Sequence, residues 1–163
     1  MINRWLWIGL ALTFLGIFAL QSWLGGVRSE RLQSENFLVE RVNAQVPLKS
    51  VRAVEHFRGE QEWTIVWGQT NTDIPIVAWI SGSTLQIDRN PTFMTRDAIE
   101  SRFLNGLRSA EIIRLSPGIV RGKKIWEVYY RKNVETKDAF GYVYYDWHTG
   151  ERLDHYYLAH LEK

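Results

Sequence analysis

The chain has 163 residues, of which 45% are hydrophobic, and its 20 basic and 18 acidic side chains give a formal net charge of +2. This hydrophobic content argues against a wholly disordered chain, and the near balance of charge without a basic stripe argues against nucleic-acid binding. The sequence contains no cysteine, which excludes structural disulfides and cysteine-ligated metals.

An uncharged apolar run extends from Trp5 to Leu24. At about 1.5 Å per residue it makes about 30 Å of helix, the thickness of the hydrocarbon core of a bilayer. Tryptophans near both ends are typical of residues at a membrane interface. A cleavable signal peptide has a shorter apolar core and a small-residue cleavage site, and a buried core helix is rarely apolar all round. We therefore expect an uncleaved stub and transmembrane anchor in residues 1–26.

The flanking charges do not fix the direction of this anchor. Arg4 precedes the apolar run, whereas Arg28 and Arg31 follow it, so the positive-inside rule does not decide. A short N-terminal stub is easier to leave inside than a large folded domain. We expect a single-pass protein of the cell membrane with a cytoplasmic N-terminus and an extracellular C-terminal domain.

Residues 27–90 have the pattern of one helix followed by a small sheet. Apolar residues at helical spacing predict a helix over Ser29–Val46, which Pro47 ends. Short alternating stretches then predict four strands, at Val51–Phe57, Glu62–Trp67, Ile74–Ile80 and Thr84–Asp88.

Residues 91–163 repeat this order. Thr95 is the expected N-cap of a second helix, and four apolar residues form its stripe: Ile99, Phe103, Leu104 and Leu107. Strands are predicted at Glu111–Leu115, Lys124–Arg131, Phe140–Trp147 and Arg152–Leu158. Pro117-Gly118 and Gly122-Lys123 mark the turn region between the first two of these strands.

The two units match in detail. Trp63–Trp67 parallels Trp126–Tyr130, and Val77–Trp79 parallels Val143–Tyr145. These matches indicate an internal duplication. We therefore predict an α+β fold, in which a single N-terminal transmembrane helix is followed by two tandem units, each with one helix packed on a small antiparallel sheet.

The segment Asp146–Gly150 is predicted to be a tight turn. The Asp146 side chain can accept hydrogen bonds from backbone amides two or three residues on, and Gly150 can adopt a positive φ. Asp146 and His148 could also serve catalysis as an Asp-x-His pair. We favour the structural interpretation.

Three features of the second unit resemble the PepSY family. They are the helix opening Thr95–Ala98, the strand that holds Trp126 and Val128, and the final hairpin Tyr142–Glu151. The layout of the whole chain is similar to the TseB-like cell wall elongation regulators of Gram-positive bacteria, a DUF5590-type family. The first unit departs from the hairpin pattern because Ser81–Thr84 lacks the aspartate.

The resemblance implies a membrane-anchored extracytoplasmic binding protein. Its expected partner is a membrane-bound protein of cell wall synthesis, a class B penicillin-binding protein, through which it regulates cell wall elongation. PepSY units also occur in propeptides of thermolysin-type metalloproteases, where they restrain the protease. The alternative is therefore an inhibitor or modulator of an extracellular metalloprotease.

The sequence holds none of the common catalytic motifs. There is no His-Glu-x-x-His, no nucleophile elbow, no phosphate-binding loop and no Ser-x-x-Lys. His148 and His155 could in principle share a metal across a hairpin, but surface histidines without metal are the preferred interpretation. We predict a protein that is not an enzyme and uses no cofactor or metal.

The tyrosines are gathered in the second unit. All seven lie beyond residue 128, and the strand Phe140–Trp147 carries large rings on both faces. One of these faces must be either covered by other parts of the chain or exposed to a partner. Tyr and Trp supply large contact areas with a polar tip. The candidate partner surface consists of Tyr129, Tyr142, Tyr144, Trp147 and Tyr156.

Overall fold

The computed structural model describes residues 35–134 and 137–158, and the chain divides into two compact units, Met1–Arg41 and Val42–Lys163. Residues 35–45 are helical, which confirms part of the helix predicted over Ser29–Val46. The predicted anchor Trp5–Leu24 lies outside the described residues. Among the residues that are described, no helix combines the length and the apolar character needed to cross a membrane.

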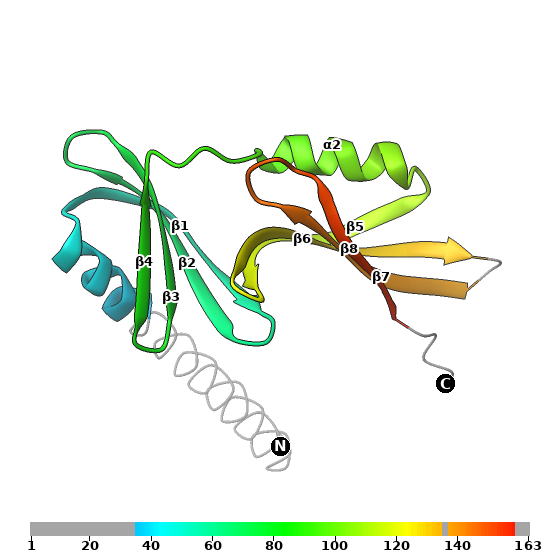
Figure 1. Ribbon diagram of the computed structural model, residues 1–163, viewed down its shortest axis with the longest axis horizontal. Helices are drawn as coiled ribbons and strands as arrows, with labels where there is room; N and C mark the ends of the chain where they lie inside the picture. Colours follow the sequence, from blue (N-terminus) through cyan, green and yellow to red (C-terminus); the bar gives the residue numbers. More distant parts are fainter. Residues whose placement is uncertain (1–34, 135–136, 159–163) are drawn as a thin grey trace, which may run out of the picture. The chain divides into compact units, whose positions relative to one another are not determined.

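The first sheet is an antiparallel meander in the order β1-β2-β3-β4 (Figure 1). Its strands are β1 (Leu48–Arg58), β2 (Glu62–Thr70), β3 (Pro75–Ser81) and β4 (Thr84–Arg89). Strands β2 and β3 lie in the middle and bury residues on both faces, as the buried pairs Ile65-Val66 and Val77-Ala78 show. The edge strand β1 has register shifts, and one of them lies between Val51 and Ala53.

The second sheet has the same antiparallel order, β5-β6-β7-β8, and helix α2 (Arg96–Gly106) precedes it. Its strands are β5 (Ala110–Val120), β6 (Lys123–Val134), β7 (Lys137–Asp146) and β8 (Arg152–Leu158). The Thr95 hydroxyl accepts a hydrogen bond from the Ala98 amide at 3.3 Å, which confirms the predicted N-cap.

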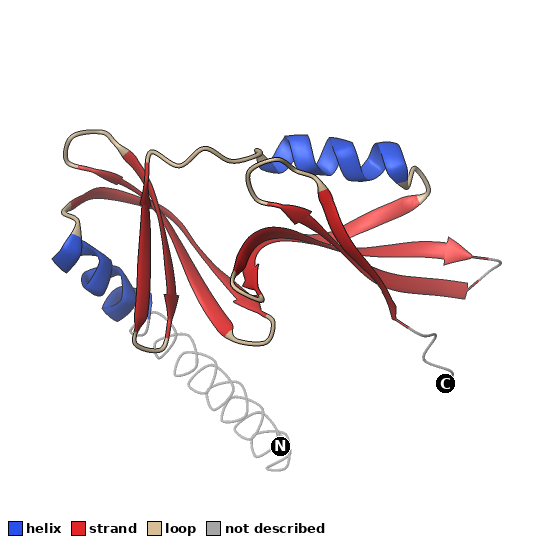
Figure 2. Cartoon of the chain, in the orientation of Figure 1, coloured by secondary structure: helices blue, strands red, loops and turns tan. Residues whose placement is uncertain are grey.

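The predicted α+β class, with two helix-on-sheet units, is wrong. The described part of the chain is mostly β, with two four-stranded antiparallel sheets and two helices (Figure 2). The strands run longer than their alternation predicts, up to 12 residues in β6, because pairing extends them beyond the apolar positions. Helix α2 buries only Ile99 and Phe103, so it contributes little of the core. The domain boundaries at 26/27 and 90/91 stay predictions.

The turn predicted at Pro117-Gly118 is also wrong, because both residues lie inside β5. A proline is tolerated there because β5 is an edge strand. Gly118 is required by close packing, since a Cβ atom at this position would lie 2.6 Å from the ring of Phe57. The reversal occurs at Arg121 and Gly122, whose φ angles are 50° and 75°, so the part of the predicted turn region at Gly122-Lys123 is confirmed.

The predicted turn at Asp146–Gly150 is confirmed. The Asp146 carboxylate accepts hydrogen bonds from the amides of His148 and Thr149 at 2.9 and 2.8 Å, and Gly150 has a φ of 64°. The Thr149 amide, followed by the His148 amide, holds the pKa of Asp146 below its usual value. These hydrogen bonds of Asp146 all lie within the turn, as the structural interpretation predicts.

The hydrophobic core draws residues from both sheets. Trp79 of β3 meets Trp147, just beyond β7, edge-on with ring centroids 5.1 Å apart. A partly buried ion pair lies beside them, in which Lys124 of β6 binds Asp88 of β4 at 2.6 Å. The indole N–H of Trp79 donates to the same carboxylate at 2.9 Å. Aromatic packing and a satisfied polar group thus join the two sheets.

Candidate functional site

Three of the predicted surface residues form one row across the second sheet. Tyr129, Tyr142 and Tyr156 lie on β6, β7 and β8 and are directly paired in the strand register. The rings of Tyr129 and Tyr142 are stacked with centroids 4.7 Å apart, as cross-strand neighbours on one face can be. Tyr156 is 41% exposed, and the other two tyrosines are half-buried. The structure therefore brings these three side chains together.

Tyr144 extends the row along β7. Its ring lies 5.6 Å from that of Tyr156, and its register partner on β6 is Glu127. Burial, followed by the charge of Glu127, raises the pKa of Tyr144 to about 12. Its hydroxyl is protonated and hydrogen-bonds to the Glu127 carboxylate. We call Tyr129, Tyr142, Tyr144 and Tyr156 the tyrosine face.

A buried carboxylate lies within the tyrosine face. Glu127 is only 3% exposed, and it pairs with Arg114 of β5 at 2.7 Å. Burial raises the pKa of Glu127, although the Arg114 hydrogen bond acts against this rise. The Arg114 guanidinium also lies 5.9 Å from the centre of the Tyr129 ring. The ion pair thus fixes the position of the rings beside it.

Trp147, the fifth predicted surface residue, lies apart from this face and is fully buried. Its ring stacks on those of Phe93 and Trp126 at 4.6 and 5.0 Å. The side chains of β7 alternate between faces, and Trp147 continues the series that also buries Val143 and Tyr145. It packs the core and offers no surface to a partner.

The histidines considered as metal ligands have other partners. The Nδ1 atom of His148 lies 2.5 Å from the carbonyl oxygen of Thr92. The Nε2 atom of His155 lies 2.5 Å from the hydroxyl of Tyr130, and its Nδ1 atom accepts a hydrogen bond from Arg152. Burial, followed by the Arg152 charge, lowers the pKa of His155. Within the ranges that the structure covers, no group of three or more such side chains could hold a metal ion.

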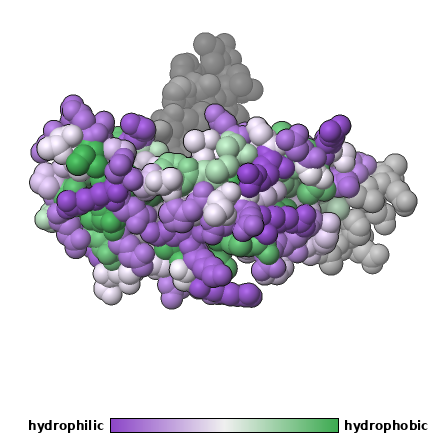
Figure 3. Space-filling view, turned by 45° about the horizontal axis from the view of Figure 1, so that its top comes forward, coloured by the Kyte–Doolittle hydropathy of each residue, from purple (hydrophilic) through white to green (hydrophobic). Residues whose placement is uncertain are grey.

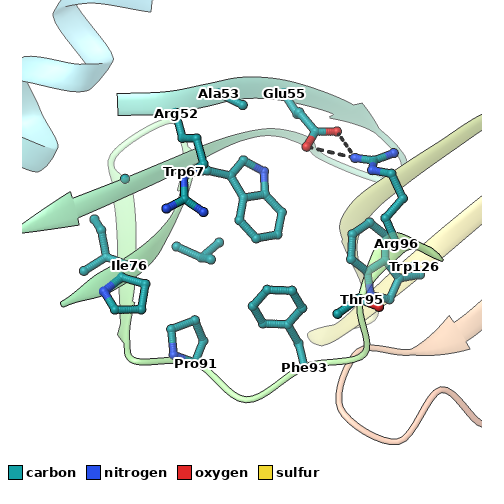
Figure 4. Close-up of a pocket in the computed structure, with 13 residues that line it drawn as sticks. Arg52, Ala53, Glu55, Trp67, Ile76, Pro91, Phe93, Thr95, Arg96 and Trp126 are labelled. Atoms are coloured by element: carbon teal, nitrogen blue, oxygen red, sulfur yellow. Dashed lines mark hydrogen bonds and ion pairs between the residues drawn. The ribbon is translucent and has the colours of Figure 1, made fainter. Parts of the chain in front are cut away.

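A second site, which the sequence did not predict, is a pocket of about 410 Å³ (Figure 4). It lies between the first sheet and the segment that leads into α2. Its apolar wall includes the rings of Trp67, Phe93 and Trp126, together with two prolines. The full lining is Arg52, Ala53, Glu55, Trp67, Gly68, Pro75, Ile76, Val77, Pro91, Phe93, Thr95, Arg96 and Trp126.

The aromatic wall is held by ring contacts. Trp67 meets Phe93 edge-on at 5.4 Å and stacks with Trp126 at 6.4 Å. The Trp126 indole donates to the Met94 carbonyl at 3.0 Å, whereas the buried indole N–H of Trp67 has no hydrogen-bond partner among the described residues. The three rings of the wall are therefore held in place by contacts with one another and with the backbone.

Two arginines and one glutamate line the pocket. Arg96 binds both carboxylate oxygens of Glu55, at 3.0 and 2.8 Å, and also donates to the Leu115 carbonyl (Figure 4). Its guanidinium lies 5.3 Å from the centre of the Trp126 ring. Arg52 makes no hydrogen bond or ion pair with any described residue. The pocket thus holds one neutralised ion pair and one uncompensated cation.

Sequence reasoning missed this pocket because its residues come from six separate parts of the chain: β1, β2, β3, the segment before α2, the first residue of α2, and β6. Their meeting depends on how the two sheets pack, which no local pattern specifies. The only local signal was the aromatic residue Phe93 in the short connector that begins with Pro91.

The exposed surface is otherwise short of large apolar patches. On the face shown in Figure 3, hydrophilic residues predominate and hydrophobic residues form small, separate areas. Between Val42 and Leu158 the exposed large hydrophobic side chains of the described residues are spread over several strands and the turn before β3: Val51, Ile74, Ile113, Leu153, Tyr156 and Tyr157. The tyrosine face and the pocket of about 410 Å³ are therefore the two candidate binding regions described for this surface.

One solved structure, the YpmB protein from Bacillus subtilis, is similar in fold to this chain. The match has a TM-score of 0.60 at 14% sequence identity, and it covers 74% of this chain and 94% of that protein. The chain therefore has a YpmB-like fold. No family model and no curated protein matches the sequence.

Proposed function

We propose that the chain is a non-enzymatic binding protein that regulates cell wall elongation by contacting a class B penicillin-binding protein. In this proposal it belongs with the TseB-like, DUF5590-type regulators and their PepSY units. Residues Trp5–Leu24 anchor it in the membrane, and the folded domain lies outside the cell. The tyrosine face is the observation that carries the proposal.

The tyrosine face is suited to protein binding for a physical reason. Each tyrosine offers a flat apolar ring and a hydroxyl, and it loses little conformational entropy when it is held. Tyr129 and Tyr142 are already stacked at 4.7 Å, so a partner would meet rings that are largely ordered. Preorganisation of this kind favours affinity.

The chemistry of Tyr144 adds specificity. Its hydroxyl hydrogen-bonds to the Glu127 carboxylate, so it offers a partner an acceptor oxygen in a fixed position. The carboxylate of Glu127 beside it is already paired with Arg114. A partner surface therefore needs hydrogen-bonding groups and apolar area, and no large opposite charge.

The proposed anchor would strengthen such an interaction without new contacts. Confining both proteins to one membrane raises the effective concentration of each for the other. A tyrosine face of modest intrinsic affinity would then be sufficient for regulation.

Copurification from membranes tests this function. The full-length protein is recovered from detergent-solubilised membranes as wild type, as the double variant Tyr142→Ala/Tyr156→Ala, and as Tyr157→Ala. Tyr157 is the matched control, because it is a neighbouring tyrosine that is 70% exposed and whose position on β8 places it on the opposite side from Tyr156.

We expect a class B penicillin-binding protein to copurify with the wild type and with Tyr157→Ala. The amount that copurifies with the double variant should be at least about tenfold lower. Circular dichroism checks that all three proteins are folded. Equal recovery with all three proteins would overturn the role of the tyrosine face. Recovery of an extracellular metalloprotease that the protein inhibits would support the PepSY-type inhibitor instead.

A further inference from the structure

The pocket beside β1 has the size of a ligand site. Its volume of about 410 Å³ falls within the range of about 300–1,000 Å³ that is usual for small-ligand pockets. Aromatic and aliphatic side chains form most of its wall, and a few polar groups lie at one side. Such a wall suits one large apolar group.

The charge of the pocket is unbalanced. Arg96 and Glu55 neutralise each other, and Arg96 is held further by the Leu115 carbonyl and the Trp126 ring. Arg96 therefore acts as a fixed part of the wall. The net charge of the lining is +1, and it resides on Arg52.

The position of Arg52 follows from the backbone of β1. The register shift between Val51 and Ala53 makes Arg52 the extra residue of a β-bulge. A bulge re-aims the side chain of its extra residue, and here the guanidinium is directed into the space beside the Trp67 ring (Figure 4). An exposed, unpaired guanidinium next to an apolar pocket is complementary to a carboxylate.

We propose that this pocket binds an acidic peptide segment of another protein. An aromatic side chain of the segment packs against the wall that Trp67 and Phe93 form together, and a carboxylate of the neighbouring residue binds Arg52. The exposed side chains of Arg52, Ala53 and Pro75 place the mouth of the pocket at the surface, where an extended chain can pass. The site goes beyond the proposed function, because it shares no residue with the tyrosine face.

Titration by nuclear magnetic resonance tests this site in the full-length protein in detergent micelles. The probes are three dipeptides, acetyl-Phe-Glu-amide, acetyl-Phe-Gln-amide and acetyl-Ala-Glu-amide, and the small molecule 3-phenylpropionate. The indole N–H signals of Trp67 and Trp126 report occupancy of the pocket. Their assignment comes from Trp67→Phe and Trp126→Phe variants.

We expect acetyl-Phe-Glu-amide to shift both indole signals and to bind at least about fivefold more tightly than either of the other dipeptides. Equal affinity for the three dipeptides, or shifts confined to other residues, would overturn the proposal. If 3-phenylpropionate binds as tightly as acetyl-Phe-Glu-amide, the peptide backbone adds nothing and the assignment to a peptide is wrong.

Two variants test the roles of the residues. Arg52→Gln should weaken acetyl-Phe-Glu-amide about fivefold and leave acetyl-Phe-Gln-amide unchanged, whereas the exposed control Arg108→Gln should change neither. Ala53→Trp should fill the mouth and abolish binding of both. If Arg52→Gln weakens both peptides equally, the proposed carboxylate contact is absent. These titrations measure binding in the pocket alone, whereas the copurification experiment measures binding through the tyrosine face. Either proposal can therefore fail without the other.

Discussion

Arg96, in the first turn of α2, holds Glu55 of β1 through both carboxylate oxygens, at 3.0 and 2.8 Å. The contact ties the helix of the second sheet to an edge strand of the first. Arg96 also donates to the Leu115 carbonyl on β5, so a single guanidinium connects β1, α2 and β5.

Because Arg96 makes more contacts than Glu55, replacing each of them with alanine should lower the free energy of unfolding by different amounts. Glu55→Ala loses one partly exposed ion pair and should lower the free energy of unfolding by about 0.5–1 kcal/mol. Arg96→Ala also leaves the Leu115 carbonyl without this donor and removes the contact with Trp126, so we expect a loss of about 2–3 kcal/mol. Urea denaturation of the full-length protein in detergent measures both. Equal losses would contradict the threefold role of Arg96.

The two stacked tryptophans of the pocket predict a second difference. Trp126→Phe leaves the Met94 carbonyl without its donor, whereas Trp67→Phe removes an N–H that has no partner among the described residues. Trp126→Phe should therefore destabilise the fold by about 1–2 kcal/mol more than Trp67→Phe. The same denaturation experiment compares them, and a larger loss in Trp67→Phe would show that its indole nitrogen has a partner.

Glu127 predicts a dependence on pH. Burial raises the pKa of this side chain above its usual value of 4.5, so the folded protein retains the proton to a higher pH than the unfolded chain does. Between the two pKa values the native state binds more protons, and the contribution of Glu127 to the free energy of unfolding therefore falls as pH rises. The Glu127→Gln variant has no titratable group at this position, so its free energy of unfolding lacks this decrease with pH.

The measurement is the difference in unfolding free energy between the wild type and Glu127→Gln at a series of pH values from about 4 to 7. We expect this difference to move against the wild type as pH rises. A difference that moves in favour of the wild type would mean that the Arg114 pair outweighs burial and that the pKa of Glu127 is lowered.

Substitution of Gly118 tests how closely β5 packs against β1. A Cβ atom at Gly118 would lie 2.6 Å from the buried ring of Phe57, so Gly118→Ala should destabilise the protein by about 1–3 kcal/mol. Gly106, the last residue of α2, has nothing within 4 Å of such an atom. Gly106→Ala should be neutral or stabilising by about 0.5 kcal/mol. If both variants have the same stability as the wild type, β1 and β5 are less closely packed than described.

Local sequence signals predicted the elements whose formation is itself local. Thr95 caps α2, and Asp146 organises its turn, because their hydrogen bonds join residues two or three positions apart. The strands around Ile65 and Val143 were found because alternation of side chains follows directly from strand geometry.

The fold class and the pocket could not be found in this way. The length of β5 depends on its pairing with β6, which carries the strand through Pro117. Alternation placed Trp147 on the same face as Val143 and Tyr145, but it did not decide which face of β7 is covered. The meeting of Trp67 with Trp126 requires the packing of two sheets, and residues that lie 59 positions apart in the chain carry no local sign of it.

Photocrosslinking in intact cells tests the central claim, that the tyrosine face binds a cell wall synthase. The photoreactive residue p-benzoylphenylalanine replaces Tyr142 in one strain and Tyr157 in another. We predict a crosslinked product with a class B penicillin-binding protein from position 142 and none from position 157. Equal crosslinking from both positions, or its absence at position 142 in a folded protein at normal abundance, would contradict the account.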